Sequence, residues 1–175
     1  MSLTSVRTRR LAAFALAVAL AFAVPALGRL HAQGAGDPPL LDGAWIVQIQ
    51  VRDCASQAPL GPPFNSLVTF HAGGTLSEST ASAAFAPGQR GEGTGLWTRL
   101  GSRTYLQRMA ALILFTTPAN PPFSPGFEAG GSTVTHTITM QDGSHFTSAG
   151  TNAFYRTGQS TPYRTGCSTA VGVRF

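Results

Sequence analysis

The stretch LLDGAWIVQIQVRDC, residues 40 to 54, decides the fold of this chain. Its residues alternate in character: Trp45, Val47, Ile49 and Val51 fall on one face, and polar side chains fall on the other. Successive side chains of a β-strand point to opposite faces, so a period of two predicts a strand whose tryptophan faces the core. The glycine just before that face allows close backbone approach at the end of the strand.

The chain after residue 40 repeats this pattern, with strand-like runs separated by turn signals and without a helical period. Short turns, the Asp-Gly turn at residues 141–144 among them, join runs two to three, four to five and six to seven. Longer Pro/Gly-rich segments follow the odd-numbered runs, and GEGTG at residues 91–95 begins within one of these predicted loops. The predicted strands are residues 44–54, 65–72, 75–80, 94–100, 103–115, 132–140, 145–155 and 163–175.

Eight sequential antiparallel strands bury their edges by closing on themselves. The sequence therefore predicts an all-β fold, an eight-stranded antiparallel up-and-down β-barrel, as one domain over residues 42–175. Closure places the last strand beside the first, with Trp45 plugging the base and the Arg174 guanidinium stacked on its indole. One rim has tight turns, and the other is rich in loops and suited to presenting a ligand.

These features resemble a known group of barrels. Gly43, Ala44 and Trp45 at the start of the first strand, the eight up-and-down strands and Arg174 near the end resemble the lipocalins and the wider calycin group. The segment TGLWTRLGSRTYLQRM, residues 94–109, is similar to the glycine–tryptophan–turn–aromatic layout of small bacterial lipocalin-like, allene-oxide-cyclase and dirigent barrels. The resemblance implies a barrel that binds a small, mostly apolar molecule.

The N-terminal residues have the pattern of an export signal. A basic segment, MSLTSVRTRR, precedes an apolar run that Pro25 ends, and Ala32 is the favoured last residue of the signal, with Gly28 and Ala26 as alternatives. We expect a signal peptide at residues 1–32, a linker at 33–41 and a secreted or periplasmic protein. Arg9 and Arg10 followed by Leu11 loosely resemble a twin-arginine export signal, so the sequence does not choose between the Sec and Tat export routes. The alternative to a cleaved signal peptide is an uncleaved membrane anchor.

The basic charge of the whole chain is concentrated in this segment. Four of the twelve arginines precede Gln33 and all seven acids follow it, which leaves eight arginines against seven acids, a net charge of +1. This balance gives no reason to expect nucleic acid as a partner. The sequence has no phosphate loop, GxSxG, HExxH or calcium loop, so it predicts no cofactor and no metal.

The two cysteines, Cys54 and Cys167, lie in the first and last predicted strands. Export makes a disulfide between them plausible, and two separately buried thiols are the alternative. The bond would close a loop of about 110 residues and stabilise the fold by about 4–5 kcal/mol through lost chain entropy.

Two polar residues share a face with apolar neighbours. His136 is in phase with Val134 and Ile138, and Glu78 is in phase with Leu76. Inside one barrel they form a possible acid/base pair, whereas a hydrogen-bonded interior histidine and a rim-exposed glutamate are the structural alternatives. His71 and His145 flank turns, where solvated side chains are more common than metal ligands.

The expected function is binding of a small, mostly apolar ligand in the lumen or at the open rim. Alternatives are a cyclase- or isomerase-like enzyme, a filled scaffold barrel with a protein partner, and an outer-membrane barrel. The last is suggested by the terminal Phe175, but residues 65–72 and 75–80 form strands too short to span. We assign no catalytic residue, and the candidate ligand-binding residues are Trp45, Phe70, Tyr105, Met109, His136 and Tyr155.

Overall fold

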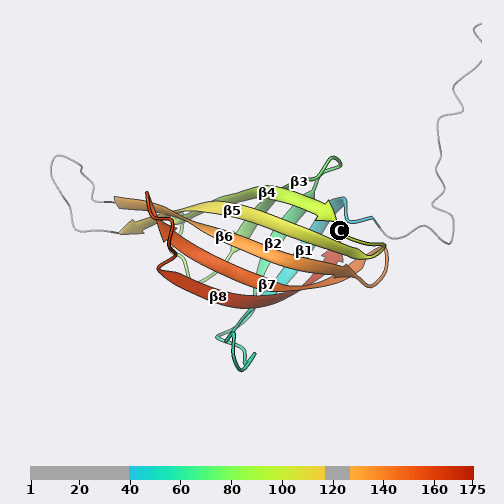
Figure 1. The fold of residues 1–175 in the computed structure, drawn as a ribbon, viewed down its shortest axis with the longest axis horizontal. Helices are drawn as coiled ribbons and strands as arrows, with labels where there is room; N and C mark the ends of the chain where they lie inside the picture. The colour runs from blue at the N-terminus through green and yellow to red at the C-terminus, as the bar shows by residue number, and fades with distance from the viewer. Residues whose placement is uncertain (1–39, 117–126) are drawn as a thin grey trace, which may run out of the picture. The chain divides into compact units, whose positions relative to one another are not determined.

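A computed structural model describes residues 40–116 and 127–175, and the expected signal peptide and most of the linker lie outside these ranges. Eight antiparallel strands pair in sequence order and close into a barrel, so the predicted fold class is confirmed (Figure 1). No helix occurs in the described ranges. The strands are β1 (Gly43–Arg52), β2 (Phe64–Phe70), β3 (Thr75–Ala81), β4 (Arg90–Arg99), β5 (Thr104–Thr116), β6 (Phe127–Met140), β7 (His145–Arg156) and β8 (Arg164–Arg174).

The pairing of β1 with β8 closes the barrel, as expected from the strand order. Trp45 lies opposite Arg174 and Arg52 lies opposite Cys167. The two rims also differ as predicted, because the turns after β2, β4 and β6 are short and those after β1, β3 and β7 are longer. On β1 Val47 points inward and the next residue, Gln48, is exposed. On β2 Phe70 points inward and Leu67 is exposed. The period of two therefore identifies the inner face of each strand.

Two strands begin several residues earlier than predicted, and other boundaries shift by one or two residues. β4 begins at Arg90, so the GEGTG segment that was expected to begin in a loop is strand, and β6 begins at Phe127 instead of at residue 132. Glycine has a low strand propensity, and runs of it are typical of turns. In β4 two of the three glycines fit because they leave room for a neighbouring strand: Gly93 pairs with Glu78 and Gly95 pairs with Met109, a requirement that only the strand pairing reveals.

The base of the barrel is filled by aromatic and aliphatic side chains around Trp45. The indole Nε1 donates to the carbonyl oxygen of Leu41 at 2.9 Å, and the Arg174 guanidinium lies 4.4 Å from the ring centroid, so the predicted stacking is confirmed. Arg174 also donates to the carbonyls of Leu40, Asp42 and Gly143, which ties the start of β1 to the β6–β7 turn. The glycine before the tryptophan is required: Gly43 has φ of 125°, and a Cβ there would collide with the Arg174 guanidinium.

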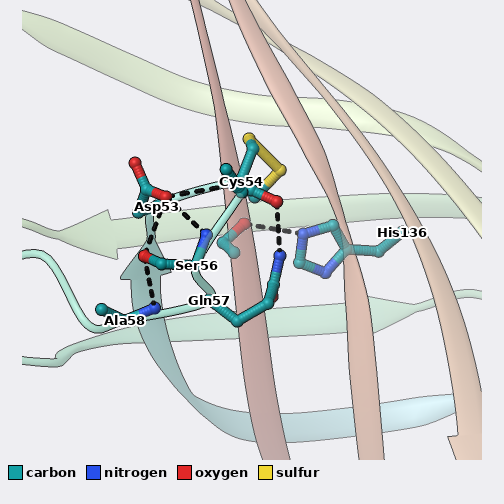
Figure 2. The surroundings of a disulfide bond; sticks show 9 residues. Asp53, Cys54, Ser56, Gln57, Ala58 and His136 are labelled. Atoms are coloured by element: carbon teal, nitrogen blue, oxygen red, sulfur yellow. Dashed lines mark hydrogen bonds between the residues drawn. A yellow bond between two sulfur atoms is a disulfide. The ribbon is translucent and has the colours of Figure 1, made fainter.

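The open rim carries the predicted disulfide. Cys54 and Cys167 are bonded, with their Cα atoms 5.1 Å apart. Cys54 belongs to a tight turn in which the Asp53 carboxylate accepts from the backbone N–H groups of Ala55 and Ser56 and from the Ser56 hydroxyl (Figure 2). These hydrogen bonds lower the pKa of Asp53 below its ordinary value. The bond joins this turn to β8, the strand that also carries Ser168.

Candidate ligand-binding site

A cavity of about 100 Å³ lies in the lumen and extends toward the open rim. Apolar side chains and a set of polar ones line it together. An engineered apolar cavity of about 150 Å³ holds a benzene molecule, so this lumen encloses a group smaller than one ring. Its lining residues on the strands are Val47, Ile49, Phe64, Ser66, Val68, Phe70, Glu78, Thr80, Arg90, Gln107, Met109, Ser132, Val134, His136, Phe146, Ser148, Asn152, Phe154, Ser168 and Ala170, and the β3–β4 loop adds Ser82 and Phe85.

His136 is the centre of a neutral polar cluster on one wall. It lies on β6 and is 5 % exposed, as the period of two predicted. Its Nδ1 lies 3.0 Å from the Ser148 hydroxyl of β7, and its Nε2 lies 2.8 Å from the Ser168 hydroxyl of β8. Burial lowers the pKa of His136 from 6.5 to about 4, so the ring is neutral at pH 7. One ring nitrogen therefore donates to one serine, and the other accepts from the second serine.

The position opposite His136 on β7 is a glycine for a steric reason. Gly150 pairs directly with His136, and a Cβ on Gly150 would lie 2.6 Å from the imidazole Cδ2. A Cβ at this position would also collide with the backbone oxygen of Thr135, so both the backbone of β6 and the imidazole ring require a glycine here. A glycine on the inward face of a strand is a sequence signal for a large neighbouring side chain.

Glu78 lies on another wall and takes part in a second polar cluster. It is 3 % exposed, so it is an interior residue and the rim-exposed alternative is wrong. Its Oε2 accepts from Arg90 at 2.8 Å, and its Oε1 accepts from the Ser66 hydroxyl at 2.9 Å, which in turn accepts from Thr80 at 3.0 Å. Gly93 pairs with Glu78, and a Cβ there would collide with the carboxylate. A buried carboxylate needs such partners because desolvation of an unpaired charge is costly.

The two polar clusters lie on different sides of the lumen. The first comes from β6, β7 and β8, and the second comes from β2, β3 and β4. In the closed strand order β3 and β7 are separated by three strands in either direction, so the clusters face each other across the barrel. Val47 and Ile49 of β1, and Met109 of β5, line the cavity between them. The site is therefore a small lumen with apolar sides and two hydrogen-bonding walls. The His136 wall is neutral, and in the other wall Arg90 balances the charge of Glu78.

The structure separates the six predicted ligand-binding residues into three groups. Phe70, Met109 and His136 line the cavity. Trp45 and Tyr105 are fully buried in the packed base and do not border the cavity. Tyr155 lies next to Phe154 on β7, and it is Phe154 that lines the cavity, because adjacent residues of a strand face opposite sides.

The sequence interpretation missed the hydrogen-bonding partners of both central residues. Ser148 and Ser168 are in phase with the apolar inner positions of their strands, which is the signal that could have identified them. Arg90 was predicted to lie in a loop. Its pairing with Glu78 was missed because β4 begins at Arg90, four residues earlier than the predicted strand.

The remaining histidines lie away from this cavity. His71 contacts the Ser77 hydroxyl at 3.2 Å, and His145 contacts the Asp142 carboxylate at 2.9 Å, both in exposed settings. Within the ranges that the structure describes, no cluster of histidine, cysteine or acidic side chains could hold a metal ion. In the same part of the chain, no helix is long and apolar enough to cross a membrane.

Comparison with known proteins finds no family. No family model matches the chain, and neither a curated protein nor a solved structure matches it. The geometry of the lumen is therefore the basis on which a function is assigned.

Proposed function

We propose that this protein is an exported, lipocalin-like carrier that binds a small, mostly apolar molecule in its lumen, with the polar end of the ligand at His136. The observation that carries the proposal is the cavity beside a buried, neutral histidine that two serine hydroxyls hold in place. Ligand sites are typically apolar cavities with a few convergent polar groups. The proposed export is supported by the disulfide and by the expected signal peptide at residues 1–32.

The protonation chemistry favours binding over proton transfer. An efficient general base has a pKa near the working pH, and a pKa of about 4 makes His136 a weak base at pH 7. Both carboxylate oxygens of Glu78 already accept hydrogen bonds, from Ser66 and from Arg90. The two residues expected as a possible acid/base pair are therefore better arranged to orient a ligand than to move a proton.

The experiment is native mass spectrometry of the full chain recovered from an exporting host, followed by a binding screen of small apolar probes. We expect retained or added small molecules on the wild type. His136→Ala should weaken binding roughly tenfold, because a ligand hydrogen bond in a buried site is worth about 0.5–1.5 kcal/mol and its loss leaves polar groups unpaired. His136→Gln keeps a hydrogen-bonding side chain and should lose less.

His71→Ala is the matched control, since His71 is exposed beside a turn and does not line the cavity. It should bind as the wild type does. A barrel that retains nothing and binds no probe would refute the carrier function. Turnover of a probe that disappears in His136→Ala would instead support the enzyme alternative.

Polar side chains at outward positions of β1 and β6 support fractionation without detergent. Gln48 and Gln50 alternate with the inward residues of β1, and the alternate positions of β6 are threonines. We expect the mature protein in the periplasm or the medium, and recovery only from outer membranes would contradict the carrier proposal.

A further inference from the structure

The lumen cavity continues into a second compartment at the open rim. This rim cup has a volume of about 840 Å³ and lies among the β1–β2 and β3–β4 loops, the end of β7 and the start of β8. Five residues line both spaces, so the cup lies directly above the lumen. They are Phe64, Ser82, Phe85, Asn152 and Phe154.

A row of aromatic rings forms one part of the wall of the rim cup. The ring centroids of Phe85 and Phe154 are 6.5 Å apart, and those of Phe154 and Tyr163 are 6.4 Å apart. The Arg164 guanidinium lies 5.9 Å from the Phe154 centroid and extends this surface at the rim. Such rings favour contact with a flat apolar body, which can stack or meet them edge to face.

The small size of the lumen indicates why a ligand would use both compartments. The lumen encloses about 100 Å³, less than one benzene ring needs, so it holds the end of a molecule better than a whole one. The end held there should be the polar one, because the lumen contains the buried hydrogen-bonding cluster of His136 and its serines, while Phe85, Phe154 and Tyr163 offer rings to the rest of the molecule in the cup.

The hydrogen bonds of His136 specify the chemistry of that polar end. The serine that accepts from the imidazole keeps its own O–H for a ligand, and the serine that donates to the imidazole keeps lone pairs for one. The cluster thus offers one donor and one acceptor. An anionic head is disfavoured, since the cation on the opposite wall, Arg90, is already paired with Glu78.

We propose that the lumen and the rim cup form one elongated site for an uncharged amphipathic molecule, whose hydroxyl or amide head lies at Ser148, His136 and Ser168 and whose flat apolar body lies against Phe85 and Phe154. This inference depends on the proposed carrier function and adds the class and orientation of the ligand.

Three probes test the inference against the full, oxidised chain by equilibrium dialysis: phenol, 4-phenylphenol and biphenyl-4-carboxylate. 4-Phenylphenol should bind roughly tenfold or more tightly than phenol, because the ring of phenol extends from the lumen only to the start of the cup, whereas the second ring of 4-phenylphenol is removed from water within the cup. It should also bind more tightly than the carboxylate. Phe85→Ala should weaken 4-phenylphenol roughly three- to tenfold and phenol by a smaller factor, because only 4-phenylphenol places a ring fully in the cup.

Phe175→Ala is the matched control, because Phe175 is an exposed phenylalanine at the opposite end of the barrel. It should leave the affinity for each probe unchanged. Phe85 lies in a loop, so its substitution should spare the fold, and an unchanged melting temperature checks this.

The outcomes distinguish the two proposals. If phenol binds but 4-phenylphenol binds no more tightly, or if Phe85→Ala weakens phenol as much as 4-phenylphenol, the elongated site is wrong while the carrier function stands. If the carboxylate binds most tightly, the uncharged head is wrong. If no probe binds, the carrier function fails as well.

Discussion

The base and the middle of this barrel follow the same alternating pattern but are packed differently. At the base the inward residues are large: the rings of Trp45 and Phe146 are 4.9 Å apart, and those of Trp97 and Tyr105 are 5.6 Å apart. In the middle the inward residues include serines and an alanine, and a cavity remains. An eight-stranded barrel is just wide enough either to be filled by side chains or to hold one small ligand. The size of the inward residues at each level therefore decides between these outcomes.

The two ends also differ in what stabilises them. The base has buried rings and an arginine that joins three backbone carbonyls, while the open end has the disulfide. This difference predicts that the open end depends on a covalent bond and the base on packing.

The largest effect is expected at the open end, from loss of the disulfide. Replacing both cysteines, Cys54→Ser with Cys167→Ser, should lower the free energy of unfolding by about 4–5 kcal/mol, because the bond closes a loop with a sequence separation of 113. Urea unfolding measures it. Equal stability of the oxidised and the serine forms would show that the open end does not need the bond.

The next effect is expected at the base. Trp45→Ala should cost about 3–5 kcal/mol, since Trp45 is fully buried and its removal leaves a cavity among the rings. Leu96→Ala, on the exposed face of β4, is the control and should cost less than about 1 kcal/mol. A cost for Trp45→Ala as small as that of the control would mean that the base is not the packed end.

An intermediate effect is expected from pH, in the middle of the barrel. The pKa of His136 is about 4 in the folded chain and 6.5 as the ordinary value. Between these values the unfolded chain binds more protons, so stability is full above pH 7 and falls as pH decreases toward 4, by about 3 kcal/mol.

The measurement compares wild type with His136→Gln by urea unfolding at several pH values. The glutamine variant does not titrate, so its stability should fall less between pH 7 and pH 4. Asp53 and Asp142 also titrate at low pH, and the difference between the two proteins removes their contribution. Parallel curves for the two proteins would contradict the burial of a neutral histidine.

The smallest effect is expected from Arg174. Arg174→Lys keeps the positive charge but loses the planar stacking on Trp45. It also loses the hydrogen bonds that the two terminal guanidinium nitrogens donate separately to the carbonyls of Leu40 and Asp42. It should lower the free energy of unfolding by about 1–2 kcal/mol, and thermal unfolding measures it. A lysine variant as stable as the wild type would show that the positive charge alone holds residues 40–42 at the base of the barrel.

Much of the barrel could be predicted from the sequence because alternation is a local property. The tryptophan face of β1, the burial of His136 and the contrast between the rims all follow from a period of two and from turn chemistry. The start of β4 could not be predicted, because its glycines read locally as a loop. Only the pairing of Gly93 with Glu78 shows that the missing side chain makes room for a buried carboxylate.

The sequence by itself determined the number of strands, their order, most of the inward residues, with Tyr155 as an exception, and the two cysteines that bond. The tertiary structure alone decided which inward residues meet. Ser148 and Ser168 reach His136 from two other strands, and Arg90 reaches Glu78 from the strand beside it. Partners of this kind depend on the register between strands, and the closure of β8 onto β1 places the two polar walls around one lumen. The same closure sets the lumen volume, because the space left in a barrel is the sum of all inward side chains at one level and not a property of any single strand.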